Sequence, residues 1–149
     1  MEMNYKECYL KGRECLRQGN IDDAIKEFEK SLELKPDFKD AVFFTGQAWE
    51  KKEEFLMAQI AYQKSIELDP LCKKSWESLY GLYERMKNWN DGLMFFERVY
   101  PGINRNSLKL WILEKFAIIY LTEKNFLRAE ECYREILKLK PGYSVAVIN

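Results

Sequence analysis

The chain has 149 residues, of which 47% are hydrophobic and 32% are charged, a composition typical of a folded domain rather than of a disordered or fibrous chain. Its 24 basic and 24 acidic side chains balance, so the sequence lacks the excess of positive charge with which proteins bind nucleic acids. It contains no histidine, which excludes catalytic dyads of serine or cysteine with histidine.

Membrane insertion and metal binding are also not expected. The sequence has no apolar run near the roughly 18 residues of a membrane span, and its start, MEMNYKEC, lacks a signal-peptide pattern. The four cysteines form no CxxC pair, so they predict no zinc site. We therefore expect a cytoplasmic protein without metal, cofactor, membrane or nucleic-acid partner, whose cysteines are reduced and largely buried.

In chain order, the first expected helix covers residues 5–17, where apolar residues return at helical spacing. Gln18, Gly19 and Asn20 should end it, with Gly19 in the left-handed conformation and Asn20 capping the next helix. That helix is expected at residues 21–34, with an inward-facing stripe formed by Ala24, Ile25, Phe28, Ser31 and Leu32. Pro36 should end the second helix and Asp37 should cap a third.

The same alternation predicts further helices at residues 38–51, 55–68, 73–86, 89–100, 107–121 and 126–139. The turn at residues 52–54 has no glycine, so we expect a right-handed or open connection there. Pro101 and Gly102 should cut one helix short, and residues 103–106 form an insertion. A ninth helix is expected to begin at Tyr143 and to continue to the last residue.

A repeat explains this alternation. Ala24 recurs as Ala58, Gly92 and Ala129, at steps of 34, 34 and 37 residues, and the aromatic position of Phe28 recurs with it. A fixed period of this length indicates one small unit stacked on itself. We assign a single array over residues 1–149 with repeats at about 5–36, 37–70, 71–106 and 107–142, and with residues 143–149 as a truncated further helix.

Two positions of the first helix in each repeat carry a family resemblance. A mostly small position holds Gly12, Gly46, Tyr80 and Ala117, and three residues later a bulkier position holds Cys15, Trp49, Tyr83 and Tyr120. This pattern resembles the tetratricopeptide repeat. The resemblance implies an all-α, right-handed solenoid of antiparallel helical hairpins, with a concave face lined mainly by the first helix of each hairpin.

Beyond the repeat, the sequence contains no motif typical of an enzyme. The acidic pairs Asp22-Asp23, Glu53-Glu54 and Glu130-Glu131 lie at helix starts or on outer faces, where solvation or the helix dipole accounts for them. Glycines never form a phosphate-binding loop. Trp76 and its aromatic neighbours could suggest stacking on RNA, but they occupy core positions of the repeat. We therefore expect no enzymatic activity.

The concave face is the expected binding site. Apolar or charged side chains that the repeat pattern leaves free should line it, and our candidates are Tyr9, Arg13, Phe43, Phe44, Gln47, Lys74, Trp111 and Ile118. Two alternatives stay open: Trp111 and Ile118 could be covered by the last helix, and Tyr9 and Phe43 could pack on each other.

One ligand type can be compared position by position. Some members of the family hold the terminal carboxylates of chaperones with lysines, asparagines and an arginine. The matching positions here hold Tyr9, Arg13, Phe44, Lys74 and Ser78, of which only Lys74 agrees in kind. The sequence therefore favours an apolar or mixed ligand over a two-carboxylate clamp.

The expected function is a non-catalytic scaffold that binds a peptide or helix of a partner protein in the concave groove. One alternative is a regulatory or targeting module of a longer polypeptide, which could itself be an enzyme. Another is self-association through the C-terminal repeat edge, because the final segment, YSVAVIN, is apolar and short. The sequence does not name the partner.

Overall fold

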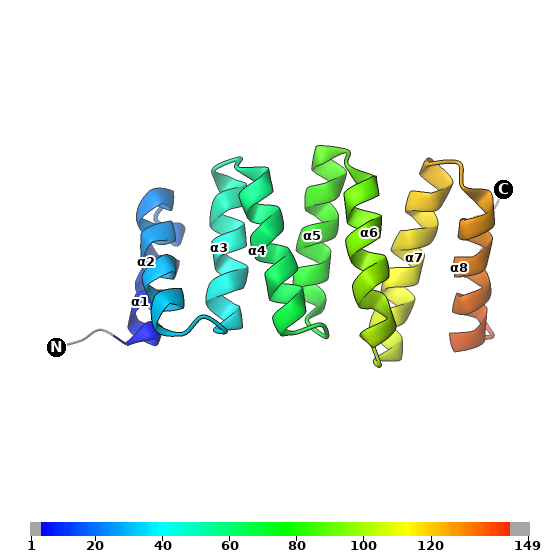
Figure 1. Ribbon diagram of the computed structural model, residues 1–149, viewed down its shortest axis with the longest axis horizontal. Coiled ribbons are helices and arrows are strands. Elements are labelled where there is room, and N and C mark those ends of the chain that lie inside the picture. Colours follow the sequence, from blue (N-terminus) through cyan, green and yellow to red (C-terminus); the bar gives the residue numbers. More distant parts are fainter. Residues whose placement is uncertain (1–3, 144–149) are drawn as a thin grey trace. The chain divides into compact units, whose positions relative to one another are not determined.

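The computed structural model describes residues 4–143, and all regular structure in this range is helical (Figure 1). The helices are α1 (Tyr5–Arg17), α2 (Ile21–Leu34), α3 (Lys39–Lys51), α4 (Phe55–Leu68), α5 (Lys73–Met86), α6 (Trp89–Val99), the 3-10 helix η1 (Tyr100–Gly102), α7 (Asn106–Thr122) and α8 (Phe126–Leu139). The expected all-α architecture of consecutive helical hairpins is confirmed.

Helix bounds agree with the sequence prediction to within one residue at most ends. The last turn before Pro101 differs most, since α6 stops at Val99 and the chain tightens into η1. Proline lacks a backbone N–H and cannot continue an α-helix from this point. The ninth helix predicted from Tyr143 onward falls almost entirely on residues 144–149, which lie outside the described residues.

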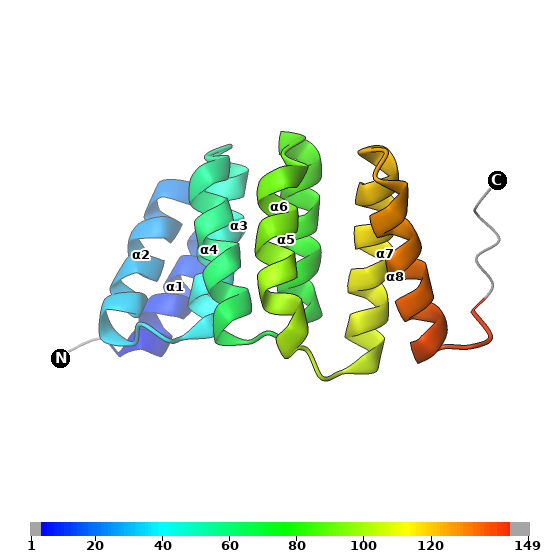
Figure 2. The same ribbon diagram turned by 45° about the vertical axis from the view of Figure 1, so that its right-hand side comes forward.

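The described chain forms two compact units, residues 4–88 and residues 89–143, which we call the N-terminal unit and the C-terminal unit. The N-terminal unit contains α1 to α5, and the C-terminal unit contains α6, η1, α7 and α8. Figure 2 shows the hairpins α1/α2 and α3/α4 side by side in the first unit, and the hairpin α7/α8 in the second.

Close helix approach within the N-terminal hairpins depends on glycine. A Cβ atom added to Gly12 would lie 2.6 Å from the Phe28 ring, and one added to Gly46 would lie 2.6 Å from the Tyr62 ring. Both rings are fully or almost fully buried, so they fill the space that the missing side chain leaves. The small position and the aromatic position of the repeat are therefore direct partners across these two hairpins.

Buried hydroxyl groups also join the helices. Ser31 Oγ donates to the Tyr5 carbonyl at 2.7 Å, which ties α2 to the start of α1. Ser65 and Ser75 are both buried, and their hydroxyls lie 2.8 Å apart between α4 and α5. Each hydroxyl thus has a partner, as burial of a polar group requires.

The four turns inside the repeats share one conformation, and here one prediction was wrong. Gly19 has a φ of 84°, as expected, but Glu53, Lys87 and Lys124 also adopt positive φ values of 62°, 53° and 60°. The right-handed or open connection predicted for residues 52–54 is therefore not formed.

Hydrogen bonding explains why the left-handed residue is kept without glycine. The N–H that follows it donates to a carbonyl five residues earlier, from Asn20 to Cys15 at 2.8 Å and from Glu54 to Trp49 at 2.9 Å. Asn125 donates to Tyr120 in the same way at 2.7 Å. This Schellman pattern satisfies carbonyls that a helix end would otherwise leave unpaired, and it requires the left-handed residue.

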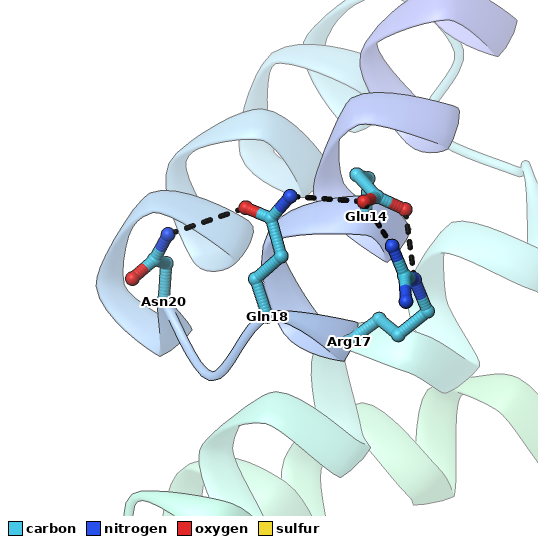
Figure 3. Close-up of polar contacts among 4 residues, drawn as sticks. All are labelled: Glu14, Arg17, Gln18 and Asn20. Atoms are coloured by element: carbon cyan, nitrogen blue, oxygen red, sulfur yellow. Dashed lines mark hydrogen bonds and ion pairs between the residues drawn. The ribbon is translucent and has the colours of Figure 1, made fainter.

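Two predicted helix caps were also wrong. Asn20 stands at the start of α2, but its side chain makes no capping bond; it donates instead to Gln18 Oε1 at 3.5 Å (Figure 3). Asp37 does not cap α3, because the helix begins one residue later and Phe38 occupies the cap position. Side-chain caps are present at α1 and α8, where Asn4 and Asn125 accept the backbone N–H three residues on.

Candidate protein-binding groove

Rings and cations form a continuous row across α1, α3 and α5 of the N-terminal unit. Arg13 Cζ lies 4.3 Å from the centre of the Phe44 ring, and the ring centres of Phe44 and Phe43 are 5.3 Å apart. Lys74 Nζ lies 5.5 Å from the centre of the Phe43 ring. Three successive first helices of hairpins thus contribute to one surface, which we call the aromatic row.

Tyr9 extends this row at the α1 end. Its ring centre lies 5.9 Å from that of Phe44 and 5.0 Å from that of Phe38, and its hydroxyl accepts a hydrogen bond from Arg13 at 3.5 Å. The Tyr9 side chain is half-buried and Arg13 is exposed. Ring contact therefore fixes the guanidinium over an aromatic surface, where cation–π attraction supports it.

Phe43 and Phe44 have different surroundings although they are adjacent in sequence. Phe43 is only 6% exposed and its ring packs 5.8 Å from that of Tyr62, so it belongs to the core of the α3/α4 hairpin. Phe44 is half-buried. The ring of Phe44 contacts that of Tyr9, which also packs against Phe38. The accessible apolar anchor of the row is therefore Phe44, with Phe43 beneath Lys74.

Gln47 lies about one turn further along α3 than Phe44 and lines a surface depression of about 510 Å³. Its polar wall includes Glu50, whose carboxylate accepts from Arg85 at 3.1 Å and from the Tyr62 hydroxyl at 3.1 Å. Burial, followed by the charge of Glu50, raises the pKa of Tyr62 above its usual range. This part of the surface carries paired charges.

The cations of the aromatic row are not paired with carboxylates in this way, unlike the neighbouring Arg17. Arg17 is bound by Glu14 at 2.5 Å, and this hydrogen bond lowers the pKa of Glu14 (Figure 3). Arg13 and Lys74 contact only rings and the Tyr9 hydroxyl, and neither has an ion pair among residues 4–143. Lys51 lines both the depression at Gln47 and a second one at Phe44, and it too has no ion pair among residues 4–143. The three cations therefore have no ion pair in the described range, although carboxylates such as Asp40 line the same depressions.

The remaining two candidates lie in the C-terminal unit. Trp111 and Ile118 stand seven residues apart on α7, which places them on one face of the helix. Ile118 is 46% exposed, and Lys115 Nζ lies 5.6 Å from the Trp111 ring between them. They form a second aromatic and cationic surface within their own unit. The expected assignment of all eight residues to one binding site stays a prediction.

The described residues contain no candidate metal site. Across residues 4–143, no cluster of three or more cysteine or acidic side chains is placed to hold a metal ion. Cys8 and Cys132 are buried and Cys15 and Cys72 are half-buried, all four as free thiols. Within the same range, no helix is long and apolar enough to cross a bilayer.

The helical hairpins, the glycine–aromatic contacts and the shared turns define a helical-repeat protein. Residues 5–38 and residues 112–143 each match the tetratricopeptide repeat family. The chain is 27% identical over 143 residues to Tetratricopeptide repeat protein 37 of Xenopus laevis and 26% identical over 140 residues to Superkiller complex protein 3 of Homo sapiens. It is accordingly a tetratricopeptide-repeat protein.

Solved structures agree on the fold. A crystal structure of MamA superimposes with a TM-score of 0.66 at 18% identity, over 93% of this chain and 79% of that one. Residues from 41 to the end of MamA from Desulfovibrio magneticus RS-1 superimpose with a TM-score of 0.63 at 15% identity, over 95% of this chain and 78% of that one. Modules of this kind are generally protein-interaction scaffolds, and no catalytic family is indicated.

The relatives are much longer proteins. The matched residues are 89% and 86% of this chain but only 9% and 8% of the frog and human proteins. The chain thus corresponds to a small part of each.

Proposed function

We propose that the aromatic row of the N-terminal unit binds a segment of a partner protein. The observation that carries this proposal is the position of Arg13 and Lys74, held over the Phe44 and Phe43 rings without carboxylate partners among residues 4–143. A charged group that is already oriented loses less entropy on binding, so such cations are suited to accept a ligand.

The chemistry of the row selects a mixed ligand. Phe44 and Tyr9 offer apolar contact, and the cations at both ends favour acidic residues. The ring-to-ring and ring-to-cation distances place Arg13 and Lys74 at most about 15 Å apart. An extended chain rises about 3.3 Å per residue, so two acidic residues within about five positions, flanking an apolar one, would reach both cations.

The test is site-specific crosslinking. A photoreactive phenylalanine analogue at Phe44 should crosslink the partner in cell extract, and peptide mapping should locate the crosslink in an acidic segment with an apolar residue. The analogue at the exposed Glu29, on α2, is the matched control and should not crosslink that segment. Crosslinking of the same segment from Glu29 alone would contradict the proposal.

Removal of the two positive charges is a second test of the proposal. Arg13→Ala with Lys74→Ala should weaken binding of the mapped peptide by at least about tenfold, because hot-spot side chains contribute more than about 1.4 kcal/mol each. Both side chains are exposed, so helicity should not change. The control pair Lys26→Ala with Lys64→Ala removes the same charge from the exposed faces of α2 and α4 and should leave affinity unchanged.

A second candidate function rests on the length comparison. Since the chain covers less than a tenth of the relatives, we propose as an alternative that it serves as a targeting or assembly module of a longer polypeptide. The human relative is named as a protein of a complex. Sequencing the transcript upstream of the codon for Met1 and downstream of the codon for Asn149 tests this alternative. An open reading frame that continues in either direction with further repeats would support it, and in-frame stop codons on both sides would exclude it.

A further inference from the structure

The C-terminal unit contains a cavity of about 540 Å³ between α6 and α8, and α7 lies behind it. Its inner wall is apolar and consists of Tyr100, Leu113, Phe116, Tyr120 and Cys132. Charged side chains surround the opening, contributed by α6 and α8. The volume falls in the range of pockets that take small ligands or a partner side chain.

Three rings of this wall are inclined to one another rather than stacked. The ring centre of Phe116 lies 6.0 Å from that of Tyr100 at an angle of 55°, and 6.3 Å from that of Tyr120 at 68°. Phe116 and Tyr120 are only 5% and 7% exposed, so the rings are fixed by packing. These three rings line one cavity, and the face of an aromatic ring attracts cations.

The charges at the opening are only partly compensated. Arg128 pairs with Glu131 at 3.1 Å, and Arg134 pairs with Glu130 at 2.6 Å. Glu97 accepts a hydrogen bond from the Tyr120 hydroxyl, a neutral donor that leaves the carboxylate charge in place. Glu135 has no ion pair within the described residues, and nor does Lys138. The lining holds three acidic and three basic side chains in all, and those without an ion pair among residues 4–143 are Glu97, Glu135 and Lys138.

Titration of the wall agrees with a site that disfavours negative charge. Burial raises the pKa of the Cys132 thiol to about 11, and the carboxylates of Glu131, Glu135 and Glu97 act in the same direction while Arg128 opposes them. Burial and the Glu135 charge also raise the pKa of Tyr100. Burial alone disfavours a charge of either sign, so only the carboxylate contributions, from Glu131, Glu135 and Glu97, favour a positive group in the cavity.

From this geometry we propose that the cavity binds a basic side chain, lysine or arginine, of a partner polypeptide. The cation lies against Tyr100, Phe116 and Tyr120, and the carboxylates of Glu97 and Glu135 balance its charge. Cation–π attraction and carboxylate pairing strengthen each other where water is partly excluded. This site uses other helices and the opposite charge preference from the aromatic row, and it does not depend on the function proposed for that row.

Four capped tripeptides test this proposal on the full chain by NMR. The probes are acetyl-Gly-X-Gly-amide with X as arginine, lysine, norleucine or glutamate. The arginine and lysine probes should shift the backbone amides of Tyr100, Phe116, Tyr120 and Cys132, and the other two should not. Equal shifts with norleucine, shifts only with glutamate, or no shift with either basic probe would overturn the proposal.

Isosteric variants test whether the carboxylate charges, rather than a change of structure, account for binding of the basic probes. Glu97→Gln with Glu135→Gln should weaken binding of the arginine probe by about tenfold, because the carboxylates carry much of the attraction. Glu33→Gln with Glu123→Gln makes the same charge change at exposed positions outside the cavity and should leave binding unchanged. Equal weakening by both pairs would show that only net charge matters and would contradict a defined site.

The Arg13→Ala, Lys74→Ala pair distinguishes the two sites. It should weaken binding at the aromatic row without altering the shifts that the arginine probe causes in the cavity. Loss of these shifts in that pair would contradict a separate cavity site.

Discussion

At the scale of single residues, the effect of a glycine in the first helix of a hairpin on stability depends on the side chains that lie beside it. Gly12 faces the Phe28 ring at a distance too short for a Cβ atom. Gly81, near the middle of α5, has nothing within 4 Å of the position a Cβ atom would occupy. The same substitution should therefore change stability in opposite directions.

We predict that Gly12→Ala lowers the free energy of unfolding by about 1–2 kcal/mol, because overpacking against a buried ring exceeds the gain in helix propensity. Gly81→Ala should raise it by up to about 1 kcal/mol, since only the propensity gain applies. Urea unfolding followed by circular dichroism measures both. Similar changes for the two variants would show that the Phe28 contact does not limit the approach of α1 and α2.

Neighbouring aromatic residues also differ at this scale. Phe43 and Phe44 both appeared as free groove residues in the sequence, because the repeat pattern requires neither. A helix turns by about 100° per residue, so two adjacent side chains leave the helix in different directions and meet different surroundings. Contact with Tyr62 places Phe43 in the core and leaves Phe44 as the accessible ring.

At the scale of elements, the left-handed turn residue is the feature that the sequence concealed. It is glycine only in the first repeat, yet all four turns adopt the same backbone path. Three of them therefore carry the cost of a side chain in the left-handed region, about 1–2 kcal/mol for each residue.

We predict that Lys124→Gly raises the free energy of unfolding by about 0.5–1 kcal/mol, because relief of this cost exceeds the added chain entropy of glycine in the unfolded state. Lys124→Ala is the matched control, since it removes the same side chain but keeps the Cβ atom, and it should not stabilise. Thermal unfolding of both variants checks this expectation. A gain with alanine equal to that with glycine would assign the effect to the lysine charge instead.

The irregular repeat step is the second feature of this scale. The third step is 37 residues rather than 34, and η1 with the residues after it accounts for the added length. Tyr100 belongs to this segment and forms part of the cavity wall in the C-terminal unit. The sequence signalled an irregular joint, but the cavity itself was not predicted, because its walls come from three separate helices.

At the scale of the whole molecule, the charge composition determines the response to pH. The chain has no histidine, so no side chain has its usual pKa near neutrality. Hydrogen bonds lower the pKa values of Glu14 and Asp22, and burial raises those of Tyr62, Tyr120 and Cys132. All these groups therefore titrate well away from pH 7.

We predict a stability plateau between about pH 5 and pH 8, with losses on both sides. The lowered carboxyl groups contribute stability above their unfolded pKa values, near 4, and lose it as the pH falls through the folded values. The Cys132 thiol ionises in the unfolded chain near pH 9 and in the folded protein only near pH 11. The unfolded state therefore gains, and stability falls by about 2 kcal/mol, as the pH rises across that interval.

Urea unfolding at unit intervals of pH checks this profile. Cys132→Ala should reduce the decline that begins near pH 9, whatever it costs at neutral pH, while the decline above about pH 10, to which Tyr62 and Tyr120 contribute, should remain. A transition in stability between pH 6 and pH 7, or a gain above pH 9, would contradict the assignment.

The sequence by itself determined the helices, their order and the repeat. These depend on local information: the helical spacing of apolar residues, the prolines that end helices, and the recurrence of a small residue opposite an aromatic one, as in Gly12 and Phe28. Because each hairpin is formed from residues close in the chain, periodicity was enough to predict it.

Only the tertiary structure decided which side chains are available for binding. Contacts between helices buried Phe43, left Arg13 and Lys74 over rings without carboxylate partners among the described residues, and brought Tyr100, Phe116 and Tyr120 around one cavity. Backbone hydrogen bonds to Trp49 and Tyr120 likewise imposed the left-handed turns at Glu53 and Lys124. Such outcomes depend on the distances and directions between packed helices, which the spacing of residues along one helix does not contain.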